Sequence, residues 1–207
     1  MVAPLAPRRL LVILLLIAPA TAPKKRKRQR ATVPTLPADL QGDDGDIRCP
    51  FHRAPSEATP QELSWFGHEL ERDGRRPEAM RCYAAAVRAY PKSALAWFDL
   101  SVAQDDDPAL ALRLYAHGVS LEPTSFHYNQ LGVMLRVRER HTEAADHFRI
   151  AAKLAPTDAD PLFNLGGTHE QLENYAAALD AYRGALELEH KNEARIQNNI
   201  ASVLGKL

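Results

Sequence analysis

The clearest pattern in the chain lies in residues 128–156, YNQLGVMLRVRERHTEAADHFRIAAKLAP. Each half of this segment has apolar or small residues three and four positions apart, which predicts two amphipathic helices in succession. Gly132 in the first helix lets the two backbones approach, and the ring of Phe148 in the second can fill the space beside it. We therefore expect Gly132 to lie near Ala144 and Phe148. A larger residue there would overpack the contact, at a cost of about 1–3 kcal/mol.

The same order of residues recurs in four units along the chain, and a terminal segment follows them. The first half of each unit has a small residue, at Gly67, Ser101, Gly132 and Gly166. The second half has an alanine and, four positions later, an aromatic ring: Ala79 and Tyr83, Ala111 and Tyr115, Ala144 and Phe148, Ala178 and Tyr182. The small residues are 34 positions apart, except for 31 between the second and third. We place the repeats at 60–93, 94–124, 125–158 and 159–192, and a terminal helix at 193–207.

Helix-boundary signals agree with these units. Residues 59–62, TPQE, have the pattern of a capping box with proline at the first helical position. Asp107-Pro108 and Asp160-Pro161 are expected to begin helices in the same way, and Gly74 is expected to follow a helix end. The second unit is short between its helices, so a tight turn is expected at 104–107.

A 34-residue period with this order of residues resembles the tetratricopeptide repeat (TPR) family. The resemblance covers residues 60–192 and predicts an all-α fold, a right-handed solenoid of helix-turn-helix repeats. It implies that the first helices line a concave groove that holds a peptide or another protein. The second unit departs most, with Ser101 and Gln104 where glycine and a large apolar residue are usual. We expect these departures to affect local stability and not the fold.

In the family's geometry, the position two residues before the small residue points into the groove. In this chain the column contains Trp65, Asp99, Gln130, Asn164 and, in the terminal helix, Asn199. A side-chain amide carries both a donor and an acceptor. Since asparagine ladders of this family bind peptide backbones, the resemblance implies that the column binds an extended peptide. Its side chains are then expected in solvent when no peptide is bound, and the alternative is ordinary polar groove surface.

The sequence contains no recognisable catalytic or cofactor motif. Gly166-Gly167 is not followed by the Lys-Ser/Thr pair of a phosphate loop. Cys49 and His52 have the spacing of metal ligands, but a second pair is missing. We therefore predict a non-enzymatic adaptor or scaffold that needs no cofactor and no metal. The alternative is the substrate-binding TPR portion of a larger or partner enzyme, of the glycosyltransferase or hydroxylase type.

The net charge of zero combines a basic N-terminal segment with an acidic body. Residues 1–60 carry ten Lys/Arg and five Asp/Glu, which leaves 16 and 21 in residues 61–207. The body therefore lacks the basic surface of nucleic-acid-binding proteins, and no nucleic-acid partner is expected.

The terminal helix is more apolar than a solenoid cap with a polar outer face. Ile196, Ile200 and Leu204 are expected to contact a partner or a second copy of the chain. The alternative is that they pack back on the fourth unit.

Residues 1–22 have the features of a secretory signal peptide. Arg8 and Arg9 precede the apolar run Leu10–Ile17, and alanines at 18, 20 and 22 give the spacing of a cleavage site. The apolar stretch of about 13 residues is shorter than the ~20 needed to cross a bilayer. We therefore predict a cleaved peptide, no stable membrane span and the secretory pathway, with the protein in the endoplasmic reticulum lumen or secreted.

The basic run at 24–30 opposes translocation and resembles a nuclear-import signal, which makes the nucleus one alternative. No acidic residue precedes Asp39, as in an organelle transit peptide, so import into an organelle is the other alternative. Residues 23–58 are rich in proline and polar residues, and we expect a disordered linker there. The folded TPR-like domain is then expected at 59–207.

Overall fold

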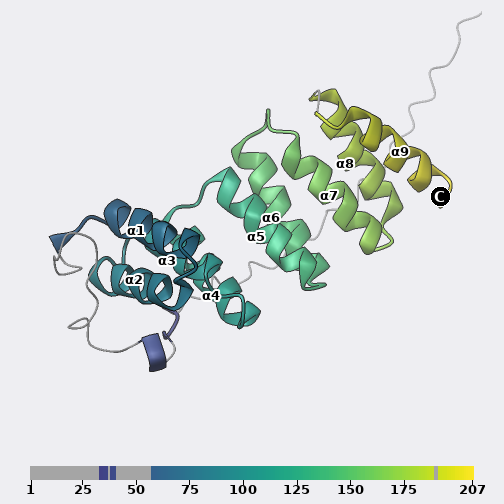
Figure 1. Ribbon diagram of the computed structural model, residues 1–207. Coiled ribbons are helices and arrows are strands. Elements are labelled where there is room, and N and C mark those ends of the chain that lie inside the picture. Colours follow the sequence, from purple (N-terminus) through teal and green to yellow (C-terminus); the bar gives the residue numbers. More distant parts are fainter. Residues whose placement is uncertain (1–32, 37, 41–56, 189–190) are drawn as a thin grey trace, which may run out of the picture. The chain divides into compact units, whose positions relative to one another are not determined.

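The computed structural model describes residues 33–36, 38–40, 57–188 and 191–207. These residues form a short 3-10 helix, η1 (Ala38–Leu40), and nine α-helices, with no strand among them (Figure 1). The expected all-α fold is therefore confirmed. The expected signal peptide, the basic run and Cys49 lie outside the described residues.

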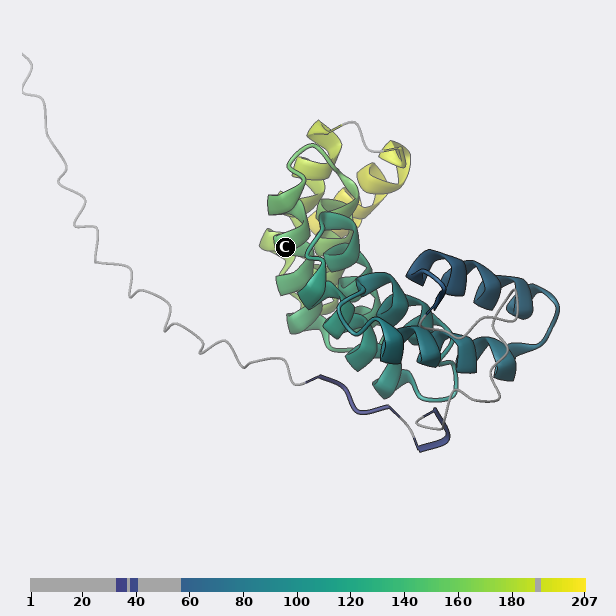
Figure 2. The same ribbon diagram turned by 90° about the vertical axis from the view of Figure 1, so that its left-hand side faces the viewer.

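Eight of the helices form four successive pairs (Figures 1 and 2). The pairs are α1 (Pro60–Arg72) with α2 (Arg76–Ala89), α3 (Ala94–Val102) with α4 (Pro108–Leu121), α5 (Ser125–Val137) with α6 (His141–Leu154), and α7 (Asp160–Gln171) with α8 (Tyr175–Glu187). The ninth helix, α9 (Glu193–Leu204), packs on α8. Each helix mainly contacts its neighbours in the chain, as expected for a solenoid.

Most of the expected helix boundaries are confirmed. Thr59 and Glu62 form the capping box, and Asp107 accepts hydrogen bonds from the first backbone N–H groups of α4. Gly74 follows the end of α1 with φ of +75°, a conformation that glycine adopts without strain. The start of α7 differs, because Asp158 and not Asp160 supplies the local carboxylate: Asp158 Oδ1 accepts from the Asp160 N–H at 3.0 Å.

The small residues of the first helices face the aromatic rings of the second helices, as expected. A Cβ atom added to Gly132 would lie 2.7 Å from Phe148 Cε1. The corresponding distances are 2.2 Å from Gly67 to Tyr83 and 2.6 Å from Gly166 to Tyr182. Since real Cβ atoms essentially never approach a heavy atom this closely, the contact needs glycine. The second pair uses Ser101 instead, and its hydroxyl donates to the Ala111 carbonyl oxygen at 2.8 Å.

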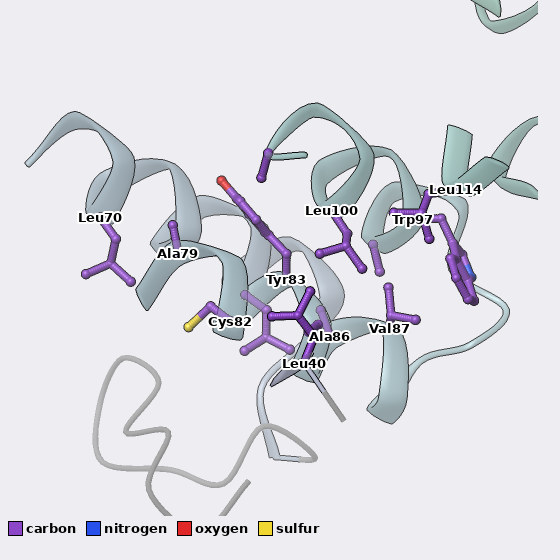
Figure 3. Close-up of a cluster of buried hydrophobic side chains, with 14 of the residues drawn as sticks. Leu40, Leu70, Ala79, Cys82, Tyr83, Ala86, Val87, Trp97, Leu100 and Leu114 are labelled. Atoms are coloured by element: carbon purple, nitrogen blue, oxygen red, sulfur yellow. The ribbon is translucent and has the colours of Figure 1, made fainter. Parts of the chain in front are cut away.

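A cluster of buried apolar side chains joins α1–α4 and includes Tyr83, Trp97 and Leu100 (Figure 3). Leu40 of η1 belongs to this cluster and is 5% exposed. The Arg88 guanidinium holds this segment by donating to the Leu40 carbonyl oxygen. Residues 38–40 lie inside the stretch expected to be a disordered linker, whose low apolar content gave no sign of this contact.

Candidate functional site

The first helix of the second repeat, α3, is shorter than its counterparts. It has nine residues, against 13 in α1 and α5 and 12 in α7. It ends at Val102, one residue after Ser101, whereas α5 continues to Val137, five residues after Gly132. The last turn of α5 therefore has no opposing turn on α3. Accordingly, the backbones of α3 and α5 stay further apart than those of α1 and α3 or of α5 and α7, and the two helices meet through the rings of Phe98 and His127.

A cavity of about 640 Å³ occupies this gap between α3 and α5. Its volume is within the range of about 300–1,000 Å³ that is typical of ligand pockets. Three large apolar side chains of its wall stand in solvent: Val102 is 65% exposed, Phe126 63% and Val137 75%. Val133 and Met134 of α5 complete the apolar side.

Aromatic rings form the end of the cavity near the start of α5. The Phe98 ring centroid lies 4.1 Å from that of His127 and 4.7 Å from that of Tyr115. His127 Nδ1 is 3.1 Å from the Glu122 carbonyl oxygen, which fixes the imidazole. Burial raises the pKa of Tyr115 to about 12, so this ring remains a neutral phenol. The wall is therefore packed and aromatic at this end.

Gln104 and Arg138 are two of the polar side chains that line the cavity, together with Ser101, Asp105 and Gln130. Gln104 is 7% exposed, and its Nε2 atom has no hydrogen-bond partner. Leaving a buried donor unsatisfied costs about 1–3 kcal/mol. At the mouth, the Arg138 guanidinium donates to the carbonyl oxygens of Pro108 and Met134 at 2.8–3.1 Å. The cavity thus combines a large apolar wall with one unused amide donor.

Sequence reasoning did not find this cavity, although one signal pointed to it. Ser101 and Gln104 were the departures of the second unit from the family pattern, and both line the cavity. The expectation attached to them concerned local stability alone.

The column expected to bind a peptide is only partly free in the structure. Gln130 lines the cavity, and Trp65 is 56% exposed. Asn164 Nδ2 donates to Asn129 Oδ1 at 3.1 Å, and Asn199 Nδ2 donates to the Tyr182 hydroxyl at 3.1 Å. These bonds join α7 to α5 and α9 to α8. Two of the expected amides are therefore already held by neighbouring helices.

Asp99 differs from the expectation for this column. It is 8% exposed, so the prediction that its side chain stands in solvent is wrong. Its Oδ1 atom lies 3.5 Å from His68 Nε2, and α1 also supplies a hydrogen bond from Ser64. Burial raises the pKa of Asp99, and the contacts with Ser64 and His68 offset part of this effect. Asp99 is buried and not in solvent because helix α1 covers its side chain.

The apolar residues of α9 divide between two environments. Ile196 and Val203 are fully buried, and Ile200 is half-buried in the same cluster. The expected partner contact through Ile196 is therefore wrong, because this side chain faces the fourth repeat. Leu204 is 52% exposed.

Neither a cluster of metal-ligating side chains nor a helix able to span a membrane occurs in the part of the chain that the structure describes. That part contains no group of three or more His, Cys, Asp or Glu side chains able to hold a metal ion. None of its helices is long and apolar enough to cross a membrane.

Comparisons with known proteins agree with this architecture. A family model described as tetratricopeptide repeat matches residues 66–118 and 131–198. No curated protein sequence matches the chain. Among solved structures, MamA has a TM-score of 0.63 at 19% identity, over 71% of this chain and 81% of MamA. PilF of Pseudomonas aeruginosa has a TM-score of 0.59 at 22% identity, over 73% of this chain and 70% of PilF. Likeness at such identities shows the fold alone.

Proposed function

Because the chain belongs to the tetratricopeptide repeat family, we propose that it is a non-enzymatic adaptor that binds a peptide or protein on its first helices. The observation that carries this proposal is the cavity between α3 and α5, which lies beside Gln130 of the amide column. A concave, mainly apolar site with a few polar groups is the usual form of a binding site.

The hydrogen bonds of the amide column support this proposal. The bond from Asn164 Nδ2 to Asn129 Oδ1 uses one of the two N–H groups of the Asn164 amide. The second N–H group of this amide and its side-chain oxygen, Asn164 Oδ1, have the capacity to bond a peptide backbone. Because the neighbouring helix already orients the Asn164 amide, this side chain loses less conformational entropy when a peptide binds.

The proposal is tested with the double variant Gln130→Ala with Asn164→Ala. Peptides selected from a displayed random library on the wild-type chain serve as ligands for isothermal titration. Each lost hydrogen bond is worth roughly 0.5–1.5 kcal/mol, so the double variant should bind about 1–3 kcal/mol more weakly.

The matched control is Gln171→Ala with Gln197→Ala, two exposed glutamines outside the column. Circular dichroism verifies that both double variants are folded. Equal affinities of the wild type and the column variant would contradict the role of these amides. Failure of the wild type to select any peptide would contradict the adaptor proposal itself.

A further inference from the structure

The second repeat and the facing helix α5 of the third repeat combine three features that a purely structural contact does not need. The first helix of the second repeat is short, Val102 and Val137 are left in solvent on either side of the gap, and Gln104 keeps a buried amide donor unused. Each of these features has an energetic cost, and a ligand that fills the cavity relieves the last two. Burial of the exposed apolar wall and a hydrogen bond to the amide would both favour binding.

We propose that the cavity between α3 and α5 binds an uncharged segment of a partner protein through at least two large apolar side chains. The Gln104 Nε2 atom is buried in the free chain, and on binding the amide turns toward the cavity and donates a hydrogen bond to a backbone carbonyl oxygen of that segment. This inference rests on the proposed adaptor function and specifies the chemistry of the partner.

The length of the apolar wall determines how many apolar side chains the partner segment must supply. Phe126 and Val137 are eleven residues apart on α5, which corresponds to about 16 Å at a rise of 1.5 Å per residue. A single side chain does not cover this distance. Apolar residues two to four positions apart in the partner do cover it, because such residues project to one side of a strand or a helix.

The charges at the cavity define the partner further. Asp105 forms an ion pair with Arg76, and all three guanidinium nitrogens of Arg138 donate to backbone carbonyl oxygens. Both charged lining residues therefore already have partners, and the apolar wall offers no counter-charge to an ionic group of the ligand. The cavity is matched to leucine, isoleucine, methionine or phenylalanine side chains.

A peptide is favoured over a small apolar molecule because the cavity is continuous with the amide column. Gln130 belongs to the column and also lines the cavity, and Asn129 on the same helix is bonded to Asn164. A segment with its side chains in the cavity therefore has backbone-binding amides directly beside it.

The test uses a random peptide library displayed on phage and selected on the full chain. Enriched peptides should share two large apolar residues, two to four positions apart. The variants Val102→Gln and Val137→Gln should each weaken binding of the enriched peptides about tenfold, as expected when apolar burial is lost. The matched control is Leu154→Gln, since Leu154 is likewise the last residue of its helix and is 51% exposed, but lies outside the cavity. This control should leave the affinity unchanged.

The outcomes separate the two proposals. Enriched peptides that bind equally well to all three variants would overturn the cavity as the site and leave the adaptor function standing. The absence of any enriched peptide would overturn both. A dimer of the purified chain that Val137→Gln dissociates in light scattering would assign the cavity to a second copy, and would also overturn the inference.

The amide has its own test in the variant Gln104→Met, which keeps the approximate shape of the side chain. If the Gln104 amide donates a hydrogen bond to the ligand, the enriched peptides should bind the variant about fivefold more weakly, because one hydrogen bond is lost. The thermal midpoint should stay constant or rise, because an unsatisfied donor has been removed. A lower midpoint with unchanged affinity would show a structural role and overturn the assignment of Gln104.

Discussion

Three buried polar side chains of the second repeat keep an atom without a hydrogen-bond partner: Asp99 Oδ2, Gln104 Nε2 and His117 Nδ1. Each such atom costs about 1–3 kcal/mol, a large share of the stability of an ordinary domain. Side chains that break a local rule without local compensation are concentrated at functional sites. The departure at Gln104 is visible in the sequence. The burial of Asp99 is not, because the repeat register gives its direction but not the cover supplied by α1.

Asp99→Asn should change how stability depends on pH. Burial raises the pKa of Asp99 in the folded state, so the folded chain binds this proton more tightly than the unfolded chain. The stability contributed by the protonated carboxyl is present at low pH and is lost as pH rises through the folded pKa. Asparagine does not ionise, so the variant should gain stability relative to wild type as pH rises from the ordinary aspartate pKa of about 4 through the raised folded pKa, and the gain should then level off.

Thermal unfolding at several pH values in this range measures the effect on Asp99→Asn. Ser64, His68 and Glu71 face the carboxyl and are left unchanged in the variant. Asp106→Asn is the control, since Asp106 is exposed in the neighbouring turn. A difference between Asp99→Asn and wild type that is independent of pH, or that has the opposite sign, would contradict the prediction.

At the scale of helices, each pair depends on a close contact between a first and a second helix. Gly132→Ala tests this contact in the third pair. Alanine in place of glycine in a helix interior should add about 1 kcal/mol of stability. The new Cβ would, however, lie 2.7–2.9 Å from three atoms of the fully buried Phe148 ring, and overpacking costs about 1–3 kcal/mol. We expect a net loss of up to about 2 kcal/mol.

Urea unfolding gives the free energies for this comparison. Gly205→Ala is the control, because the nearest atom to its added Cβ lies at 3.5 Å and its φ is −72°. A Gly132→Ala chain more stable than wild type would mean that the ring moves aside at little cost.

The packing of the terminal helix α9 on the fourth repeat can be tested in the same way. Ile196 is fully buried against the fourth repeat, so Ile196→Ala should cost about 2–5 kcal/mol. Leu204 is 52% exposed, and Leu204→Ala should change stability by less than about 0.5 kcal/mol. Chemical unfolding of both variants measures the difference, and equal losses would contradict the register of α9. The sequence placed apolar residues on more than one face of this helix, so it could not show which of them pack inward.

At the scale of the whole chain, the repeat pattern was sufficient to predict the helix pairs and their main contacts. The small and aromatic residues recur at fixed positions, and the packing of Gly132 on Phe148 follows from their spacing alone. The cavity could not be predicted in this way. It results from a turn that α3 lacks, whereas the 31-residue spacing in the sequence predicts a shorter connection between the two helices. Similarly, the hydrogen bonds that hold the Asn164 and Asn199 side chains depend on distances between helices, which the repeat pattern does not give.

We propose that residues 1–22 are a signal peptide, on the basis of Arg8 and Arg9 before the apolar run Leu10–Ile17 and the alanines that follow. Cleavage should then occur after Ala20 or Ala22. Pro23 directly follows Ala22, which disfavours the second position. N-terminal sequencing of the mature protein from its native cells measures the cleavage site.

A matched variant makes this test specific. Leu14→Arg places a charge in the middle of the apolar run and should block translocation, because the run then no longer forms an apolar segment of sufficient length. The variant should keep its N-terminus and remain in the cytosol, while the wild type is shortened and sediments with membranes or leaves the cell. A wild-type chain that retains Met1 or Val2 and fractionates with the cytosol or the nucleus would contradict the secretory route. The basic run at 24–30 would then be the segment that directs the chain, since six positive charges there oppose translocation and resemble a nuclear-import signal.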